Sequence, residues 1–240
     1  MHDITMELSS SEQPPYVPKP HQWPALKEAV HHSQQLFRQV LSSMAEPGTF
    51  AEVDLAPLPQ DVAMSPAAWA VLLVLCDLDT RVWIADELNR DGIAEAIAFH
   101  TGARIVSRAE EADFALVVPS TCQAMSRFSE GSDIYPDRST TLIVVLASLT
   151  EGRSDASHRG NTCWQLSGPG ILNQRVLELD DTAEALMQRL ALNRASFPLG
   201  LDTILTSESS LTAIPRSTRI QKPLEGASPT PLTHPAKERV

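Results

Sequence analysis

Residues 135–146 have the sequence YPDRSTTLIVVL, in which a polar turn is followed by a run of apolar residues, Leu142–Leu146. An uninterrupted apolar run that is rich in Val and Ile and preceded by turn residues is typical of a strand buried on both faces. Such strands occur in parallel or mixed sheets that helices cover. The stretch therefore predicts an α/β fold.

A second stretch, Thr162–Leu166, leads into Ser167-Gly168-Pro169-Gly170. We expect a short strand followed by a tight loop whose glycines leave the backbone bare. Ligands of open α/β sheets bind at the loops that follow the strands, and N–H groups without side chains can approach an anion closely. The loop is therefore a candidate anion site, and the alternative is a simple turn.

Helical spacing and capping residues predict the elements around these strands. Apolar residues from Leu36 to Met44 recur at helical intervals and stop at Glu46-Pro47-Gly48, which predicts a helix of about 15 to 18 residues. Ser65-Pro66 supplies a cap and a first-turn proline for a buried apolar helix over 67–75. The other predicted elements are strands at 82–84 and 114–118, helices at 87–99 and around 184–190, and a hairpin of 201–205 with 211–214.

The 240-residue chain is 42% hydrophobic and carries a formal net charge of −11. This length fits one domain. The acid excess disfavours nucleic acid and anionic membranes as partners, because both reward clustered Lys and Arg. The longest apolar run, Ala67–Cys76, is far shorter than the roughly 20 residues of a membrane span. Met1–Ser11 contains acidic residues and no long apolar run, so we expect no signal peptide.

The cysteines and prolines indicate compartment and domain limits. Cys76, Cys122 and Cys163 are an odd set without CxxC spacing, which favours a reducing cytoplasm and disfavours disulfides or a metal site. Prolines are frequent near both ends. We therefore expect a flexible segment at 1–25, from which Trp23 docks on the core, an α/β domain at 26–220 and a disordered proline-rich tail at 221–240.

No lysine occurs between Lys27 and Lys222. A pyridoxal-phosphate enzyme needs a core lysine for its Schiff base and a P-loop needs one for phosphate, so we expect neither mechanism. The motifs HExxH, GxSxG and GxGxxG are also absent. Cys76 is interpreted as buried packing, and Cys163 is either a nucleophile or packing.

Arginine carries the positive charge of the core. Arg138 precedes the predicted strand, where a guanidinium can hold a phosphate or carboxylate through two hydrogen bonds. The alternative is a structural ion pair with Asp133 or Asp137. Arg216 and Arg219 are interpreted as a basic C-terminal edge. The candidate ligand site comprises Arg138, Tyr135, Ser139, Gly168, Gly170 and Arg38, with no catalytic residue assigned and no metal ligand expected.

Seven segments together resemble those of a known family. In chain order they are Phe37-Arg38 with Met44-Ala45-Glu46-Pro47-Gly48, Leu78-Asp79-Thr80, Phe99-His100-Thr101-Gly102, Tyr135-Pro136-Asp137-Arg138-Ser139, Gly168-Pro169-Gly170-Ile171, Phe197-Pro198-Leu199-Gly200-Leu201-Asp202 and Ile214-Pro215-Arg216. The family that they resemble is PhnH, a subunit of the bacterial carbon–phosphorus lyase core complex. The resemblance spans about Leu26 to Arg219 and omits both ends.

The resemblance to PhnH implies a three-layer αβα sandwich with a mixed sheet, similar to the pyridoxal-phosphate-dependent transferases but without that cofactor. It also implies a homodimer when the chain is alone and a cytoplasmic complex with PhnG, PhnI and PhnJ. In this family PhnG, PhnH and PhnI, acting with PhnL, are associated with displacing adenine from ATP by a phosphonate, so ATP and a phosphonate are the candidate ligands. PhnJ then cleaves the carbon–phosphorus bond with an iron–sulfur cluster, for which this chain lacks the cysteines.

Two other functions stay open at the level of sequence. One is a free-standing enzyme that acts on a nucleotide or a phosphate ester, in which case the isolated chain would turn over substrate. The other is a purely structural scaffold, in which case the candidate site residues would tolerate replacement as long as assembly survived.

Overall fold

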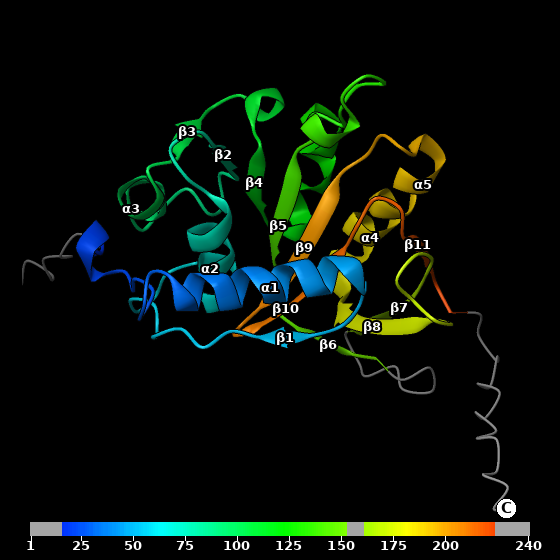
Figure 1. Ribbon diagram of the computed structural model, residues 1–240, viewed down its shortest axis with the longest axis horizontal. Coiled ribbons are helices and arrows are strands. Elements are labelled where there is room, and N and C mark those ends of the chain that lie inside the picture. The colour runs from blue at the N-terminus through cyan, green and yellow to red at the C-terminus, as the bar shows by residue number, and fades with distance from the viewer. Residues whose placement is uncertain (1–15, 153–160, 224–240) are drawn as a thin grey trace, which may run out of the picture.

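A computed structural model describes residues 16–152 and 161–223, and within them a seven-stranded mixed sheet forms the centre of the molecule (Figure 1). The predicted strand at 142–146 is β5 (Thr141–Val145), in the middle of this sheet, and Leu142, Ile143 and Val144 are fully buried. The α/β fold and the mixed sheet are confirmed. From edge to edge the strands are β1 (Ala51–Glu52), β10 (Ser210–Ile214), β9 (Asp202–Ser207), β5, β4 (Phe114–Val117), β2 (Arg81–Ile84) and β3 (Arg104–Val106).

Strands β9, β5, β4, β2 and β3 run parallel to one another, and β10 is antiparallel to β9. The predicted hairpin is therefore confirmed as β9 and β10, with Glu208 at the turn in a left-handed conformation (φ 49°). Parallel strands begin at the same edge of a sheet. The first residues of β2, β4, β5 and β9 accordingly lie at one end, which we call the amino edge.

Helices α1 (His31–Ala45), α2 (Pro66–Leu75) and α3 (Ile93–Thr101) cover one face of the sheet. Ile143 and Ile204 point from the sheet into this layer. The hydroxyl of Ser65 accepts a hydrogen bond from the N–H of Ala68, as expected of a helix cap. The predicted first helix and the buried helix after Ser65 are thus confirmed.

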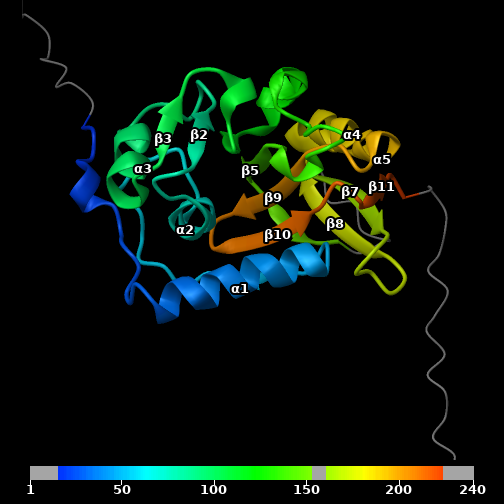
Figure 2. The same cartoon turned by 45° about the horizontal axis from the view of Figure 1, so that its top comes forward.

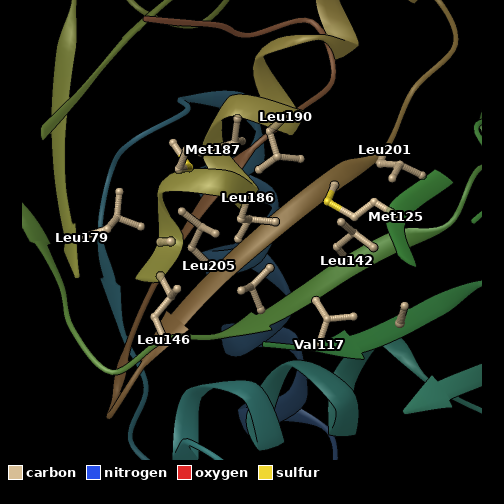
Figure 3. Packing of buried hydrophobic residues seen from close by; sticks show 14 of the residues in the cluster. Val117, Met125, Leu142, Leu146, Leu179, Leu186, Met187, Leu190, Leu201 and Leu205 are labelled. Atoms are coloured by element: carbon tan, nitrogen blue, oxygen red, sulfur yellow. The ribbon is translucent and has the colours of Figure 1, made fainter. Parts of the chain in front are cut away.

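The opposite face is covered by helix α4 (Glu184–Ala191), the 3-10 helix η3 (Pro119–Arg127) and a second sheet. Leu142 and Leu205 pack there against Leu186 and Met187 of α4 (Figure 3). Figure 2 shows α1 and α4 on opposite sides of the central sheet. Within the described residues, the second sheet has four antiparallel strands, in the order β11 (Arg219–Gln221), β7 (Asn161–Ser167), β8 (Arg175–Asp180) and β6 (Leu149–Glu151).

The second sheet corrects the expected αβα sandwich, because the third layer combines a helix with strands. Trp164 and Leu166 of β7 are buried, whereas Cys163 and Gln165 are only partly buried. This alternation is typical of a strand that covers a core with one face. The strand predicted at 162–166 is confirmed as β7, and the loop Gly168–Gly170 after it joins two strands of the second sheet.

The helix predicted over 87–99 begins six residues later, at Ile93. Asp91 (φ 58°) and Gly92 (φ 73°) both have left-handed backbone, which cannot continue a helix from the preceding residues. The helix ends at Thr101, two residues beyond the predicted end, and Gly102 follows it with left-handed backbone (φ 76°). The remaining described elements are η1 (Pro20–Gln22), η2 (Ala109–Glu111), η4 (Pro136–Arg138), η5 (Asp181–Ala183) and α5 (Asn193–Ser196).

The described part of the N-terminal segment, residues 16–25, packs on the domain. The Trp23 ring lies 4.9 Å from the Trp69 ring, and the indole N–H of Trp69 donates to the Pro24 carbonyl at 2.8 Å. The expected docking of Trp23 is confirmed. The rest of that segment and almost all of the predicted tail at 221–240 lie outside the described residues. In the described ranges no helix has both the length and the apolar character needed to cross a bilayer.

Candidate functional site

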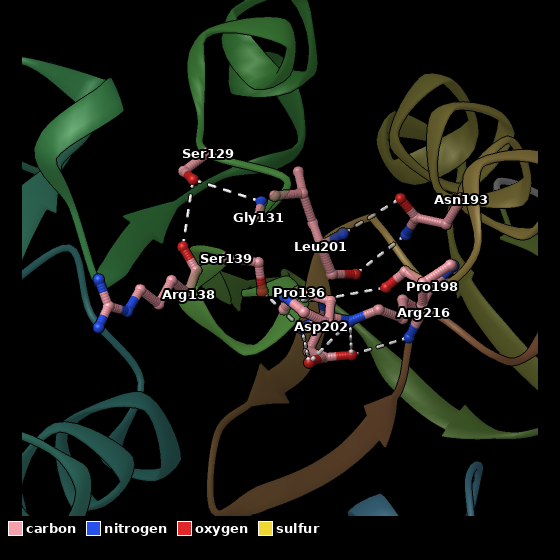
Figure 4. Close-up of polar contacts among 10 residues, drawn as sticks. All are labelled: Ser129, Gly131, Pro136, Arg138, Ser139, Asn193, Pro198, Leu201, Asp202 and Arg216. Carbon is pink, nitrogen blue, oxygen red and sulfur yellow. Dashed lines mark hydrogen bonds and ion pairs between the residues drawn. The ribbon is translucent and has the colours of Figure 1, made fainter. Parts of the chain in front are cut away.

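Segments 135–139, 197–202 and 214–216 are distant in the sequence and meet at the amino edge (Figure 4). The first segment precedes β5, the second precedes and begins β9, and the third follows from β10. The register of the sheet explains the meeting, because Thr141 pairs with Asp202, and Ile214 pairs with Thr203.

Arg216 holds these segments together. Its guanidinium forms an ion pair with the Asp202 carboxylate (Nε to Oδ1, 3.1 Å), and its backbone N–H donates to the same oxygen at 2.9 Å. The guanidinium also donates to the carbonyls of Pro136 and Pro198 and to the Ser139 hydroxyl. The two charged side chains are only 12% and 21% exposed. The interpretation of Arg216 as part of a basic C-terminal edge is therefore wrong.

Arg138 lies on the turn 135–139, which Arg216 contacts. Its side chain points away from Arg216 (Figure 4). Its guanidinium stacks over the Tyr135 ring, with Cζ 4.2 Å from the ring centre. Arg138 is exposed, and it has no ion pair with Asp133, Asp137 or any other carboxylate of residues 16–152 and 161–223. Stacking uses the face of the guanidinium and leaves its in-plane N–H groups available. Arg138 can therefore bind an anion without losing its contact with Tyr135.

A cavity of about 510 Å³ opens beside Arg138 at the amino edge. One wall comes from the turn before β5, and the other comes from the first residue of β2 and the segment that precedes β4. The lining residues are Arg81, Glu110, Ala112, Asp113, Phe114, Ser129, Asp137, Arg138, Ser139 and Thr141.

The second arginine of the cavity, Arg81, is already neutralised by Asp113. The guanidinium makes two hydrogen bonds to this carboxylate, at 3.0 and 2.8 Å. Burial, the largest single influence, raises the pKa of Asp113, but the hydrogen bonds and charge of Arg81 together outweigh it and leave the pKa below its ordinary value. Glu110 is likewise paired, with Arg108. Arg138 is thus the cation of the cavity that remains available for a ligand.

The cavity also offers polar groups of both kinds. The Ser139 hydroxyl accepts from Arg216 and can still donate its proton, and Asp137 presents a carboxylate without an ion pair among the described residues. An anion is favoured beside Arg138 and disfavoured beside Asp137. The combination suits a ligand that carries an anionic group together with hydroxyl or amino groups, as a nucleotide does.

The glycine loop lies elsewhere. A Cβ atom on Gly170 would lie 1.9 Å from the Ala45 carbonyl at the end of α1, and one on Gly168 would lie 3.4 Å from the Ser217 carbonyl. Arg175 donates to the Glu46 carbonyl beside this contact, at 2.8 Å. Neither glycine lines the cavity of Arg138, so within the described residues the predicted site divides into two places. Gly170 allows close backbone packing against the end of α1, whereas Gly168 faces the segment before β11.

Two further candidates lie away from the cavity. Arg38 is an exposed residue on α1. Cys163 lies on β7, where burial and then the Glu178 carboxylate raise the pKa of its thiol. Burial raises the pKa of Cys76 to about 12. A raised pKa lowers the thiolate fraction at neutral pH, which disfavours either cysteine as a nucleophile.

The sequence interpretation missed Arg81, Asp113 and Asp202 as site residues. Asp202 and Arg216 lie in two of the segments that carry the family resemblance. This resemblance could therefore have identified them as site residues. No local sequence pattern indicates that Arg81 pairs with Asp113, because their contact depends on the neighbouring positions of β2 and β4 in the sheet.

The segments that carry the resemblance form three groups in space. Segments 135–139, 197–202 and 214–216 form the amino-edge cluster described above. Gly170 packs on the 44–48 segment, and a Cβ on Gly102 would lie 2.5 Å from the Leu78 side chain, which joins 99–102 to 78–80. Residues 24–221 match the family described as "Bacterial phosphonate metabolism protein (PhnH)".

The chain belongs to the PhnH family.

Two relatives support this membership of the PhnH family. The chain is 32% identical over 199 residues to the alpha-D-ribose 1-methylphosphonate 5-triphosphate synthase subunit PhnH of Rhizobium meliloti (strain 1021). The aligned residues make up 82% of this chain and 94% of the relative. It is 29% identical over 196 residues to HtxG of Stutzerimonas stutzeri, whose name describes a C-P lyase subunit. This alignment covers 81% of this chain and 87% of that relative. Both alignments include most of the PhnH domain.

Proposed function

We propose that this chain is a subunit of a carbon–phosphorus lyase complex and is required for the catabolism of organophosphonates. The observation that carries the proposal is the 32% identity to the Rhizobium meliloti synthase subunit over 94% of its length. By the same likeness, the chain acts in the step that joins a phosphonate to ribose C1 of ATP. A phosphonate oxygen bonds to C1, the bond from C1 to N9 of adenine breaks, and adenine leaves with a proton.

This reaction brings two polyanions together, so it needs fixed positive charge. In our proposal Arg138, with Tyr135 and Ser139, holds the phosphonate or a phosphate of ATP in the amino-edge cavity. The guanidinium, which has no carboxylate partner among the described residues, lies beside a cavity of about 510 Å³, and this supports the role. Asp137 in the same wall can accept hydrogen bonds from the ribose hydroxyls.

The proposed assembly is a cytoplasmic complex with PhnG, PhnI and PhnJ, and a homodimer when the chain is alone. We also propose that the fold is related to the pyridoxal-phosphate-dependent transferases, with neither pyridoxal phosphate nor an iron–sulfur cluster held by this chain. The absence of lysine between Lys27 and Lys222 supports the first of these two exclusions.

Reconstitution tests the proposal. The complex is co-expressed with and without this chain, and adenine release from ATP plus methylphosphonate is measured by chromatography. We expect release only when the chain is present with its partners. Equal release without the chain would contradict the proposal, and turnover by the isolated chain would instead support a free-standing enzyme.

A further inference from the structure

A group of large apolar side chains is exposed next to the Arg216 contacts. Arg216 binds both the Pro136 carbonyl and, at 3.5 Å, the Pro198 carbonyl, which brings the loop before β5 beside the segment after α5. We call the following four side chains the apolar edge surface: Ile134, Tyr135, Leu192 and Phe197, which are 79%, 48%, 58% and 50% exposed.

Two arginines border this surface, and each stacks on one of its aromatic rings. Arg138 lies over Tyr135 at 4.2 Å, and Arg194 lies over Phe197 at 5.2 Å. Neither guanidinium has an ion pair with a carboxylate in the part of the chain that the structure describes. Apolar area bordered by unpaired arginines on aromatic rings is typical of a protein interface.

We propose that the apolar edge surface is where this chain docks another subunit of the complex, through a segment that presents apolar side chains flanked by Asp or Glu. The inference rests on the proposed function, because it assumes membership of the complex. A carboxylate of the partner would supply the counter-charge that Arg194 lacks among the described residues, while Arg138 stays available for the substrate. A second copy of this chain fits less well, because a two-fold contact would place the same arginine-bordered surface on both sides.

The backbone under the surface is already fixed. The Asn193 amide group makes two hydrogen bonds to the backbone of Leu201, at 2.9 and 3.2 Å, and Gly200 donates its N–H to the Glu130 carbonyl at 3.0 Å. Arg189 adds an ion pair to the Glu130 carboxylate at 2.9 Å. A surface held in this way loses little conformational freedom on binding, which favours affinity.

The test compares matched variants in the full chain. Arg194→Glu and Leu192→Ser alter the apolar edge surface and leave Arg138 in place. The controls Arg38→Glu and Leu172→Ser alter an exposed arginine on α1 and a leucine that is 96% exposed beyond the glycine loop. Each purified variant is titrated against the remaining subunits of the complex, co-expressed without this chain. Thermal unfolding of each variant checks that it is folded.

We expect affinity to fall about tenfold or more for Arg194→Glu and for Leu192→Ser, and to stay unchanged for both controls. A photoreactive phenylalanine analogue in place of Phe197 should crosslink to a partner peptide that contains Asp or Glu. Crosslinking to a second copy of the chain, or parental affinity of Arg194→Glu and Leu192→Ser, would overturn the proposal. If the parental chain itself failed to join the other subunits, the proposed function would be contradicted. That outcome is distinct from failure of the docking surface alone, in which the parental chain binds and the variants bind equally well.

Discussion

Arg138 and Arg216 lie on opposite sides of the same turn, and their charges are used differently. Arg216 is partly buried and committed to Asp202, whereas Arg138 is exposed and stacked on an aromatic ring. Their substitutions should therefore affect different properties, one of them ligand binding and the other stability.

Arg138→Ala should weaken the binding of ATP or methylphosphonate to the assembled complex by about 1.5–3 kcal/mol, the size of a charge-assisted contact. Its free energy of unfolding should change little, because no carboxylate of the described residues depends on it. Arg138→Lys keeps the positive charge but not the planar pair of N–H donors. Its affinity for the ligand should therefore lie between those of the parental chain and Arg138→Ala. Isothermal calorimetry measures the affinity, with Arg38→Ala as the exposed control. Equal affinity of the two alanine variants would remove Arg138 from the site.

Arg216→Ala should lower the free energy of unfolding by about 3 kcal/mol or more, because it leaves the Asp202 carboxylate unpaired in a partly buried position. It also removes the donor that holds Pro136 and Ser139. Urea unfolding gives the value. The double variant with Asp202→Ala should lose less than the sum of the two single variants, and strict additivity would show that the pair is not coupled.

The Arg81–Asp113 pair should make stability depend on pH. The pKa of Asp113 is lowered in the folded chain, so its contribution is present above the pKa of the unfolded chain and is lost as pH falls through the folded value. Asp113→Asn should thus cost up to about 1 kcal/mol at neutral pH, since the pair is partly exposed, and the cost should shrink below about pH 4. Parallel urea titrations across this range test it. Asp137→Asn is the control, and a cost for Asp113→Asn that did not vary with pH would contradict the assignment.

At the scale of elements, the glycine loop contributes to packing between α1 and the second sheet. Gly170→Ala should destabilise the fold by about 2 kcal/mol or more, because the new Cβ would collide with the Ala45 carbonyl and the backbone is left-handed (φ 78°). Gly168→Ala shares a positive φ (131°) but meets its nearest atom at 3.4 Å, so it should cost less. Thermal unfolding compares the two. Equal losses would show that strain alone, without the collision, sets the cost.

The sequence predicted those elements whose burial leaves a local pattern. β5 is covered on both faces, so its apolar run is continuous, and Ser65 and Pro66 mark the start of α2. The second sheet leaves a weaker pattern, because β6 and β11 have only three residues each and pair with strands distant in the sequence. For the same reason the sequence identified Arg138 as a candidate but not the contacts of Arg216, which only the assembled sheet creates.

At the scale of the whole molecule, the central sheet separates two apolar clusters. Leu142 and Ile143 are adjacent and both fully buried, but they point into opposite clusters. Each changed to alanine should cost about 2–5 kcal/mol, and the two losses should add, since the sheet lies between the sites. Both variants should still unfold in one transition, because both clusters share the same strands. Circular dichroism with tryptophan fluorescence would test this, and two separate transitions would argue for independent units.

The place of β9 and β10 in the sheet has a consequence for synthesis on the ribosome. β5 leaves the ribosome long before Asp202–Ile214, yet β9 is its neighbour in the sheet, and α1 and β1 from the start of the chain pack on β10. Until those last strands emerge, one edge of β5 is unpaired and the N-terminal helix lacks its support. The nascent chain thus carries an open strand edge from the emergence of β5 until that of β9, a state prone to aggregation. Folding of this subunit is accordingly completed only after its C-terminal strands have been released.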